Sequence, residues 1–148
     1  MTEEQVTKAL LKWLMDTGWS IVCYDFPQSG TGVLLHPNES NDKNKDAINP
    51  DIVAVNGDKC VFFENKSYFY YPDFEKVNML RTTDSYSNAI SDLLKGYSVK
   101  KIYYGIGYPA SVHKKKAQES ELMTDFIIGV NPDYSTRYMY ILDDKIFM

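Results

Sequence analysis

Hydrophobic and polar residues follow two periods along this chain, one typical of helices and one typical of strands. From residue 2 to residue 17 the apolar residues recur every three or four positions and form one stripe of a helix. A second helical stripe consists of Ile90, Leu93, Leu94 and Tyr97. Ser85 is the candidate N-terminal cap of that second helix. Elsewhere, short apolar runs bounded by Gly, Pro, Asn and Asp indicate strands.

The pattern as a whole predicts an α/β protein with a mixed central sheet flanked by helices. Helices are predicted over residues 2–17, about 73–82, 85–96 and 111–121. Strands are predicted over residues 19–24, 51–56, 59–66, 100–107, 124–130 and 136–142.

A loop predicted over residues 25–49 is long for a compact domain. Loops of this length are commonly functional or mobile. Because this one ends at Pro50-Asp51, it could enter a nucleic-acid groove, and a disordered insertion is the equal alternative.

Composition favours one globular domain over residues 1–148, since the 148 residues are 44% hydrophobic and show no internal repeat. No apolar run is long enough to span a membrane, and the N-terminus lacks the features of a signal peptide, so we expect a cytoplasmic protein. Cys23 and Cys60 lie in apolar strand contexts and are expected to be core thiols. His36 and His113 complete no zinc spacing and have no evident nucleophile, which argues against a zinc site and a serine or cysteine hydrolase.

The chemistry of the chain is concentrated around one predicted hairpin. Pro50-Asp51 precedes its first strand, and Glu64-Asn65-Lys66 ends its second. Two carboxylates and an amine brought together there could hold a hard divalent cation beside a proton-handling group, as phosphodiester hydrolysis needs. The alternative is a surface hairpin with an ordinary exposed Glu-Lys pair.

The turn of the hairpin decides whether these side chains meet. If residues 57–58 form a two-residue loop, Asp51 lies opposite Glu64; if residues 56–57 form it, which is the stronger turn signal, Asp51 is a diagonal neighbour of Glu64. Both registers put Asp51, Glu64 and Lys66 on one face of the hairpin. A three-residue loop would put Asp51 on the opposite face and is excluded by the hypothesis.

Two carboxylates this close repel unless a cation lies between them. We expect Mg²⁺, which needs few carboxylates and keeps several waters, and Mn²⁺ may replace it. One of those waters could attack phosphorus while Lys66 orients it or stabilises the developing charge.

These residues resemble the PD-(D/E)XK nuclease superfamily, which includes restriction endonucleases, Holliday-junction resolvases and VRR-Nuc repair nucleases. Pro50-Asp51 and Glu64-Asn65-Lys66 match its motif, and the predicted order of the first half of the chain matches its core. The resemblance implies a restriction-endonuclease-like core of αβββαβ order, here with extra C-terminal strands. It also implies catalytic residues Asp51, Glu64 and Lys66, and a metal held by Asp51, Glu64 and the backbone carbonyl of Asn65. Asn65 itself departs from the apolar residue that many members carry.

The first predicted helix offers one further metal ligand. Family members often place a metal-binding glutamate in its first turn, and Glu3 falls inside the apolar stripe while Glu4 falls at its edge. The alternative is a capping box from Thr2 to Gln5, in which acidic residues only favour the helix N-terminus.

The charge of the chain argues against a strong grip on nucleic acid, since the formal net charge is −4. Candidate nucleic-acid-binding residues are Lys100, Lys101, Lys114, Lys115 and Lys116, in a stretch that carries no acid. A solvated helix face is the alternative for these lysines. The motif is directly followed by Tyr68, Tyr70 and Tyr71. These tyrosines could stack on bases. The alternative is that they are half-buried residues of the fold.

The sequence therefore predicts a magnesium-dependent endonuclease acting on DNA, with RNA not excluded, of restriction or repair type. Cutting both strands with one site per chain would call for a homodimer. The alternatives are a nuclease-fold subunit that binds nucleic acid without cutting it, and a protein-interaction domain with no nucleic-acid role.

Overall fold

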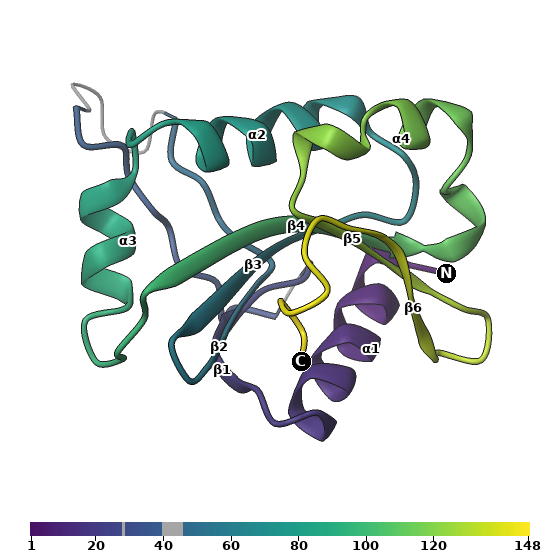
Figure 1. Ribbon diagram of the computed structural model, residues 1–148, viewed down its shortest axis with the longest axis horizontal. Coiled ribbons are helices and arrows are strands. Elements are labelled where there is room, and N and C mark those ends of the chain that lie inside the picture. The colour runs from purple at the N-terminus through teal and green to yellow at the C-terminus, as the bar shows by residue number, and fades with distance from the viewer. Residues whose placement is uncertain (28, 40–45) are drawn as a thin grey trace.

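The computed structural model describes residues 1–27, 29–39 and 46–148 and contains one mixed six-stranded sheet with helices on both faces (Figure 1). The strands are β1 (Ser20–Tyr24), β2 (Ile52–Asn56), β3 (Lys59–Asn65), β4 (Lys101–Pro109), β5 (Phe126–Val130) and β6 (Thr136–Ile141). The helices are α1 (Glu3–Asp16), α2 (Tyr71–Thr82), α3 (Ser87–Leu93) and α4 (Lys115–Glu119), with 3₁₀ turns η1 (Ala110–Val112) and η2 (Glu121–Met123).

The strands lie in sequence order, and three of them are parallel. β3 pairs with β4 and β4 with β5 in parallel, whereas the pairs β1–β2, β2–β3 and β5–β6 are antiparallel. Helices α2 and α3 lie in the crossover from β3 to β4, as a parallel connection requires. The predicted α/β class with a mixed sheet is confirmed.

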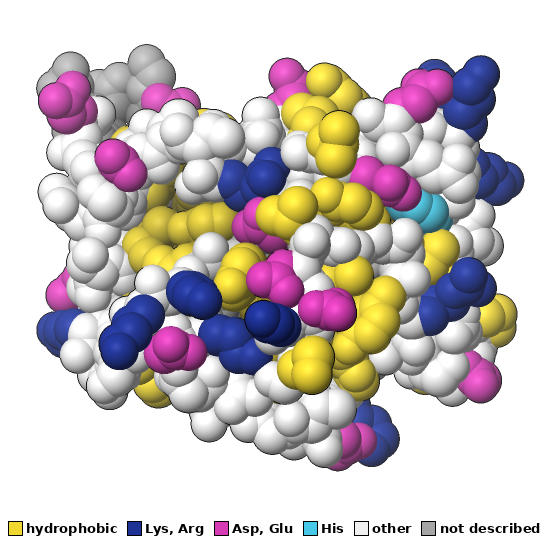
Figure 2. All heavy atoms as spheres, in the orientation of Figure 1, with side chains coloured by type: hydrophobic (Ala, Val, Ile, Leu, Met, Phe, Trp, Pro, Cys, Tyr) yellow, Lys and Arg dark blue, Asp and Glu magenta, His cyan; other side chains and the backbone are white. Residues whose placement is uncertain are grey.

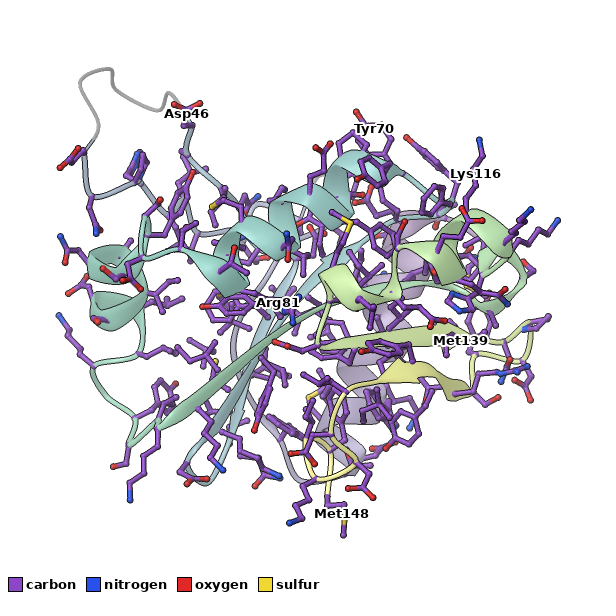
Figure 3. All side chains as sticks on the ribbon, turned by 45° about the horizontal axis from the view of Figure 1, so that its top comes forward. Asp46, Tyr70, Arg81, Lys116, Met139 and Met148 are labelled. Atoms are coloured by element: carbon purple, nitrogen blue, oxygen red, sulfur yellow. The ribbon has the colours of Figure 1, made fainter. Side chains whose placement is uncertain are left out.

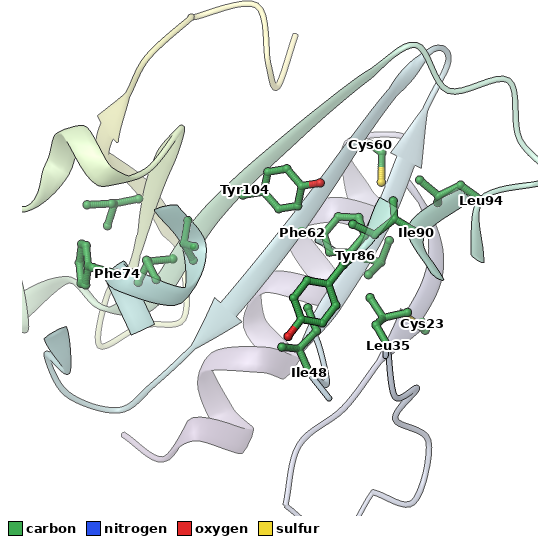
Figure 4. Packing of buried hydrophobic residues seen from close by; sticks show 14 of the residues in the cluster. Cys23, Leu35, Ile48, Cys60, Phe62, Phe74, Tyr86, Ile90, Leu94 and Tyr104 are labelled. Carbon is green, nitrogen blue, oxygen red and sulfur yellow. The ribbon is translucent and has the colours of Figure 1, made fainter. Parts of the chain in front are cut away.

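Each face of the sheet has its own core. α1 packs Val6, Leu10 and Leu14 against one face, and its Thr2–Gln5 capping box has both hydrogen bonds. On the other face, α2 and α3 pack on alternate residues of the same strands, including Phe62 of β3 (Figure 4). The strands are apolar on both faces because both are covered.

The described part of loop 25–49 contributes buried residues to the second core. Leu35 and Ile48 are buried and form a β-bridge. Figure 4 shows both side chains beside Phe62 and Tyr86. Residues 40–45, within the polar part of this loop, lie outside the described residues.

The helical predictions after the motif need three corrections. α3 begins after Tyr86, and its cap is Asn38, whose Oδ1 accepts the N–H of Asn88 at 3.0 Å; Ser85 is therefore not the cap. Tyr97 is exposed and lies beyond the helix. The predicted helix over residues 111–121 is the five-residue α4 between η1 and η2.

Cys23 and Cys60 are buried free thiols, as predicted. In the part of the chain that the structure describes, no helix combines the length and the apolar character of a membrane span.

Candidate functional site

The β2–β3 hairpin has the register that brings Asp51 next to Glu64. Asn56 pairs with Lys59 across a loop formed by Gly57 and Asp58, and Gly57 takes a φ of 61°. The carbonyl of Asp58 accepts N–H groups at the start of β4, so contacts with a third strand outweigh the stronger turn signal of residues 56–57.

Asp51 lies just before the regular ladder of β2. Its N–H donates to the carbonyl of Phe63 at 3.0 Å, and the first ladder pair follows at Ile52. Its buried side chain is fixed by Oδ2, which accepts the N–H of Asn65 at 2.7 Å. The carboxylate of Asp51 therefore lies at the end of β3, beside Glu64.

Glu64 and Lys66 lie on the α2 side of the sheet, and Asn65 points to the α1 side. The fully buried Asn65 donates from Nδ2 to Thr7 of α1 at 3.0 Å. The backbone of Lys66 is fixed at the carboxyl end of β3, because its N–H donates to the carbonyl of Gly107 in β4. The three predicted catalytic residues are thus brought together at the carboxyl end of β3.

Helix α2 adds two charged residues that sequence reasoning missed. Lys76 Nζ lies 2.9 Å from Glu64 Oε1, and both side chains are largely buried. Asp73, one turn earlier, is only 5% exposed, and its Oδ2 has no hydrogen-bond partner within the described residues. The sequence signal for Asp73 is a second Pro-Asp pair, Pro72-Asp73, at the start of the helix.

Glu3, the candidate in the first turn of α1, also lies near these groups, since its charge affects the proton affinity of Asp51, Glu64 and Lys66. Glu4 instead pairs with Lys8 at 3.4 Å on the exposed side of α1. We call the six charged side chains at this end of the sheet the acidic cluster: Glu3, Asp51, Glu64, Asp73, Lys66 and Lys76.

Burial and mutual repulsion raise the pKa values of the acids in this cluster. Burial, with the charge of Glu64, raises the pKa of Asp51 to about 8, although the N–H of Asn65 favours the ionised form. Burial also raises the pKa of Glu64 in spite of its bond to Lys76. Burial and the charge of Glu64 raise the pKa of Asp73 to about 6.

The pKa of Lys66 is also raised, but for an amine this favours the charged form. Burial lowers its pKa, but the carboxylates of Asp73, Glu3 and Glu64 outweigh that effect and raise it, so the ammonium form is favoured. Its Nζ also lies 5.2 Å from the ring centroid of Tyr70. Lys66 therefore stays protonated beside the acids.

The acidic cluster has the donor chemistry for a hard cation but not a closed cage. Four carboxylates against two ammonium groups leave a net charge of −2 when all are ionised. Within residues 1–27, 29–39 and 46–148, no group of three or more His, Cys, Asp or Glu side chains is arranged to hold a metal ion. Asp51 and Glu64 could still be two ligands of Mg²⁺, which usually keeps several waters. Lys76 already binds one of the two oxygens of Glu64, Oε1, at this site.

The candidate nucleic-acid-binding lysines fall into two groups. Lys100 and Lys101 lie at the start of β4, level with Lys59, and so roughly 20 Å along the sheet from its carboxyl end. The exposed Lys114, Lys115 and Lys116 follow the carboxyl end of β4, on the side of the acidic cluster. The structure therefore does not form one basic edge from all five.

Comparison with models of known protein families gives no match for this chain, and comparison with curated proteins gives none either. The resemblance to PD-(D/E)XK nucleases therefore depends on the motif residues and on the geometry of the acidic cluster.

Proposed function

We propose that this protein is a metal-dependent endonuclease of the PD-(D/E)XK type that hydrolyses phosphodiester bonds in DNA. The observation that carries the proposal is the meeting of Asp51, Glu64 and Lys66 at the end of β3. The order of α1, three antiparallel strands, a helical crossover and β4 agrees with a restriction-endonuclease-like core.

The net charge of the acidic cluster supports a divalent ion as the missing partner. Buried carboxylates that repel one another are costly unless they are paired with a proton or a cation. Here the two ammonium groups neutralise only half of the four acids, and Asp73 Oδ2 has no donor among the described residues. A bound Mg²⁺ or Mn²⁺ would balance the remaining charge.

The residues have distinct roles in this proposal. Asp51 and Glu64 hold the ion, with the carbonyl of Asn65 and Glu3 as further ligands directly or through water. The ion supplies Lewis acidity and a water of lowered pKa. Lys66, kept protonated by its acidic neighbours, orients the attacking water and stabilises charge on the phosphate oxygens.

The first experiment is incubation of the protein with plasmid, linear duplex and single-stranded substrates, with and without Mg²⁺ or Mn²⁺. We expect metal-dependent cleavage that Lys66→Ala and Asp51→Asn each reduce by at least about 100-fold, the scale found when one charge-stabilising group is removed. Lys95→Ala is the matched control, since it removes an exposed lysine between α3 and β4, away from the acidic cluster. Cleavage that persists in Lys66→Ala, or none with any substrate, would overturn the proposal.

One observation favours a second candidate, a nuclease-fold subunit that binds nucleic acid without cutting it. Lys76 already occupies an oxygen of Glu64 and could act as a permanent counter-ion in place of a metal. Binding in Ca²⁺ without cleavage in Mg²⁺ or Mn²⁺ would select this candidate. No mobility shift on any DNA or RNA at low salt would instead favour a protein-interaction domain.

Cutting both strands of a duplex with one site per chain requires two copies, so we also propose a homodimer on substrate. Light scattering that shows a monomer on uncut duplex in Ca²⁺ would remove this part of the proposal.

A further inference from the structure

A cleft of about 380 Å³ with both polar and apolar walls opens at the carboxyl ends of the three parallel strands. Its walls include Gln5 of α1, Ser67, Val130 and Tyr134. Ser67 directly follows Lys66, so the cleft begins one residue from the acidic cluster. Ligands of α/β proteins commonly bind at this end of parallel strands.

Tyr134 stands in this cleft in an unusual backbone conformation. It lies in the β5–β6 turn with a φ of 67°, which is uncommon for a bulky residue and costs on the order of 1–2 kcal/mol. Its side chain is 51% exposed, and its hydroxyl accepts a hydrogen bond from Gln5 Nε2 at 3.2 Å. The ring is therefore held in place at the wall of the cleft without being buried.

A second group of exposed aromatic rings lies directly after the motif. Tyr68 and Tyr70 are 52% and 43% exposed, and their ring centroids are 6.0 Å apart in an edge-to-face arrangement. Tyr70 also contacts the Lys66 ammonium. Figure 3 shows Tyr70 at the start of α2 and Lys116 in α4 on the same side of the molecule. Exposed rings thus stand beside Lys66 as well as in the cleft.

The charge distribution points to unpaired bases as the occupants. Binding of a duplex draws most of its affinity from contacts of Lys and Arg with phosphates. This chain has a net charge of −4, and on the face seen in Figure 2 its basic side chains form separate groups among acidic ones. A single strand depends less on such contacts for each phosphate than a duplex does, and its unstacked bases can bind the faces of exposed aromatic rings.

We infer that this protein binds single-stranded nucleic acid, with one unpaired base in the cleft on Tyr134 and the adjoining phosphate at the acidic cluster. This inference rests on the proposed function for the role of that phosphate. Binding of the base is independent of catalysis and can be measured separately.

The test is fluorescence anisotropy at low salt, with Ca²⁺ replacing Mg²⁺ so that no strand is cut. The probes are a short labelled DNA strand, an RNA strand of the same sequence, and the corresponding DNA duplex. We expect the single strands to bind more tightly than the duplex. Tyr134→Ala should weaken single-strand binding about ten-fold, the scale of one lost base stack, while Tyr134→Phe stays within about two-fold.

Two further variants separate stacking from folding. Tyr134→Gly removes the ring but accepts the left-handed φ, so it should lose as much affinity as Tyr134→Ala. Tyr97→Ala removes an equally exposed tyrosine from the connection between α3 and β4, at the other end of the sheet, and should bind as the unmodified protein does. Duplex binding tighter than single-strand binding, or a Tyr134→Ala effect no larger than that of Tyr97→Ala, would overturn the inference.

The two proposals fail in different ways. If single strands bind through Tyr134 but are never cut in Mg²⁺ or Mn²⁺, the cleft is supported and the nuclease proposal fails. If Lys66-dependent cleavage of duplex DNA is seen and Tyr134→Ala changes nothing, the nuclease proposal stands and the cleft does not bind substrate.

Discussion

Two buried aspartates, Asp51 and Asp125, occupy similar places in the sheet. Asp51 directly precedes β2 and accepts the N–H of Asn65 at 2.7 Å, and Asp125 directly precedes β5 and accepts the N–H of Tyr104 at 2.9 Å. Each is 8% exposed. The backbone thus positions both carboxylates in the same way, and the difference between them lies in their neighbours.

The neighbours of Asp125 complete its hydrogen bonds and balance its charge. Its second oxygen accepts the Nε–H of Arg81, from the last turn of α2, at 2.9 Å. Arg81 uses another nitrogen to donate to the carbonyl of Leu122 at 3.0 Å. A buried ion pair needs balanced charges and complete hydrogen bonds. Asp125 and Arg81 meet both conditions and connect α2 to the sheet.

The neighbours of Asp51 leave charge and hydrogen-bonding capacity unused. The acidic cluster to which Asp51 belongs holds four carboxylates but only two lysines, and one oxygen of Asp73 has no donor in the described part of the chain. Such an arrangement lowers stability by itself, and strongly perturbed carboxyl groups of this kind are concentrated at functional sites. The comparison indicates that Asp125 serves the fold, and it agrees with the proposed role of Asp51 as a metal ligand.

The largest effect that can test this difference is the loss of Arg81. Arg81→Met leaves Asp125 buried without its cation and should lower the free energy of unfolding by about 3–5 kcal/mol, as measured by urea denaturation. Lys76→Met is the matched change in the middle of α2. It should lower stability less, because burial already raises the pKa of Glu64, which can take up a proton once the ammonium is lost.

Magnesium makes the contrast sharper. Added Mg²⁺ should raise the stability of both variants, since the acidic cluster is intact in Arg81→Met and an ion bound to the folded state stabilises it. Lys76→Met should gain more, since the ion also replaces the lost ammonium. Equal recovery of the two variants, or recovery of neither, would contradict the assignment of the two sites.

The pH dependence of stability is the next effect in size. The pKa of Asp51 is raised to about 8 in the folded protein, so between its unfolded value and pH 8 the folded state binds more protons than the unfolded state. Stability is therefore lost as the pH rises. From pH 5 to pH 7 the loss should be about 2 to 3 kcal/mol from Asp51 alone, with Glu64 and Asp73 adding to it in the same direction.

Urea unfolding at several pH values without divalent ions measures this slope. Asp51→Asn should make the slope shallower, whereas Glu4→Gln, at an exposed acid paired with Lys8, should leave it unchanged. A slope of the opposite sign would mean that the carboxylates of the acidic cluster are ionised at low pH and do not repel one another as inferred.

The sequence predicted what local patterns determine. The apolar stripe and capping box of α1 are local, so this helix was found with bounds close to those observed. The hairpin was also found, but its loop is Gly57-Asp58 and not the more strongly indicated Asn56-Gly57. The convergence of Asp51 and Glu64 also followed from counting residues across one hairpin. The hydrogen bond from the N–H of Asp51 to the carbonyl of Phe63 could not be predicted by such counting, because Asp51 is the first residue outside the regular β2–β3 ladder.

Features that depend on distant segments were not predictable from local patterns. Asn38 caps α3 from a loop about fifty residues earlier, so a search near the helix chose Ser85. Lys76 reaches Glu64 because α2 crosses over the sheet. The predicted helix 111–121 is interrupted because His113 is held by Tyr108 and Glu121 through both ring nitrogens. In each case a tertiary contact outweighs the local preference.

The smallest effect expected is also the most informative about purpose. Asp73→Asn removes one negative charge from the acidic cluster, so at pH 7 without metal it should raise the free energy of unfolding by about 1 kcal/mol. Asp125→Asn, the matched change in the balanced pair, should lower it, because Arg81 loses its counter-ion. Urea denaturation of the two variants side by side gives the signs directly. If neutralisation of Asp73 stabilises the fold, Asp73 does not serve stability. That result would agree with the proposed function, in which its negative charge draws a cation to Glu64. If Asp73→Asn destabilises the protein as Asp125→Asn does, Asp73 is a structural residue like Asp125, and the contrast between the two ends of α2 disappears.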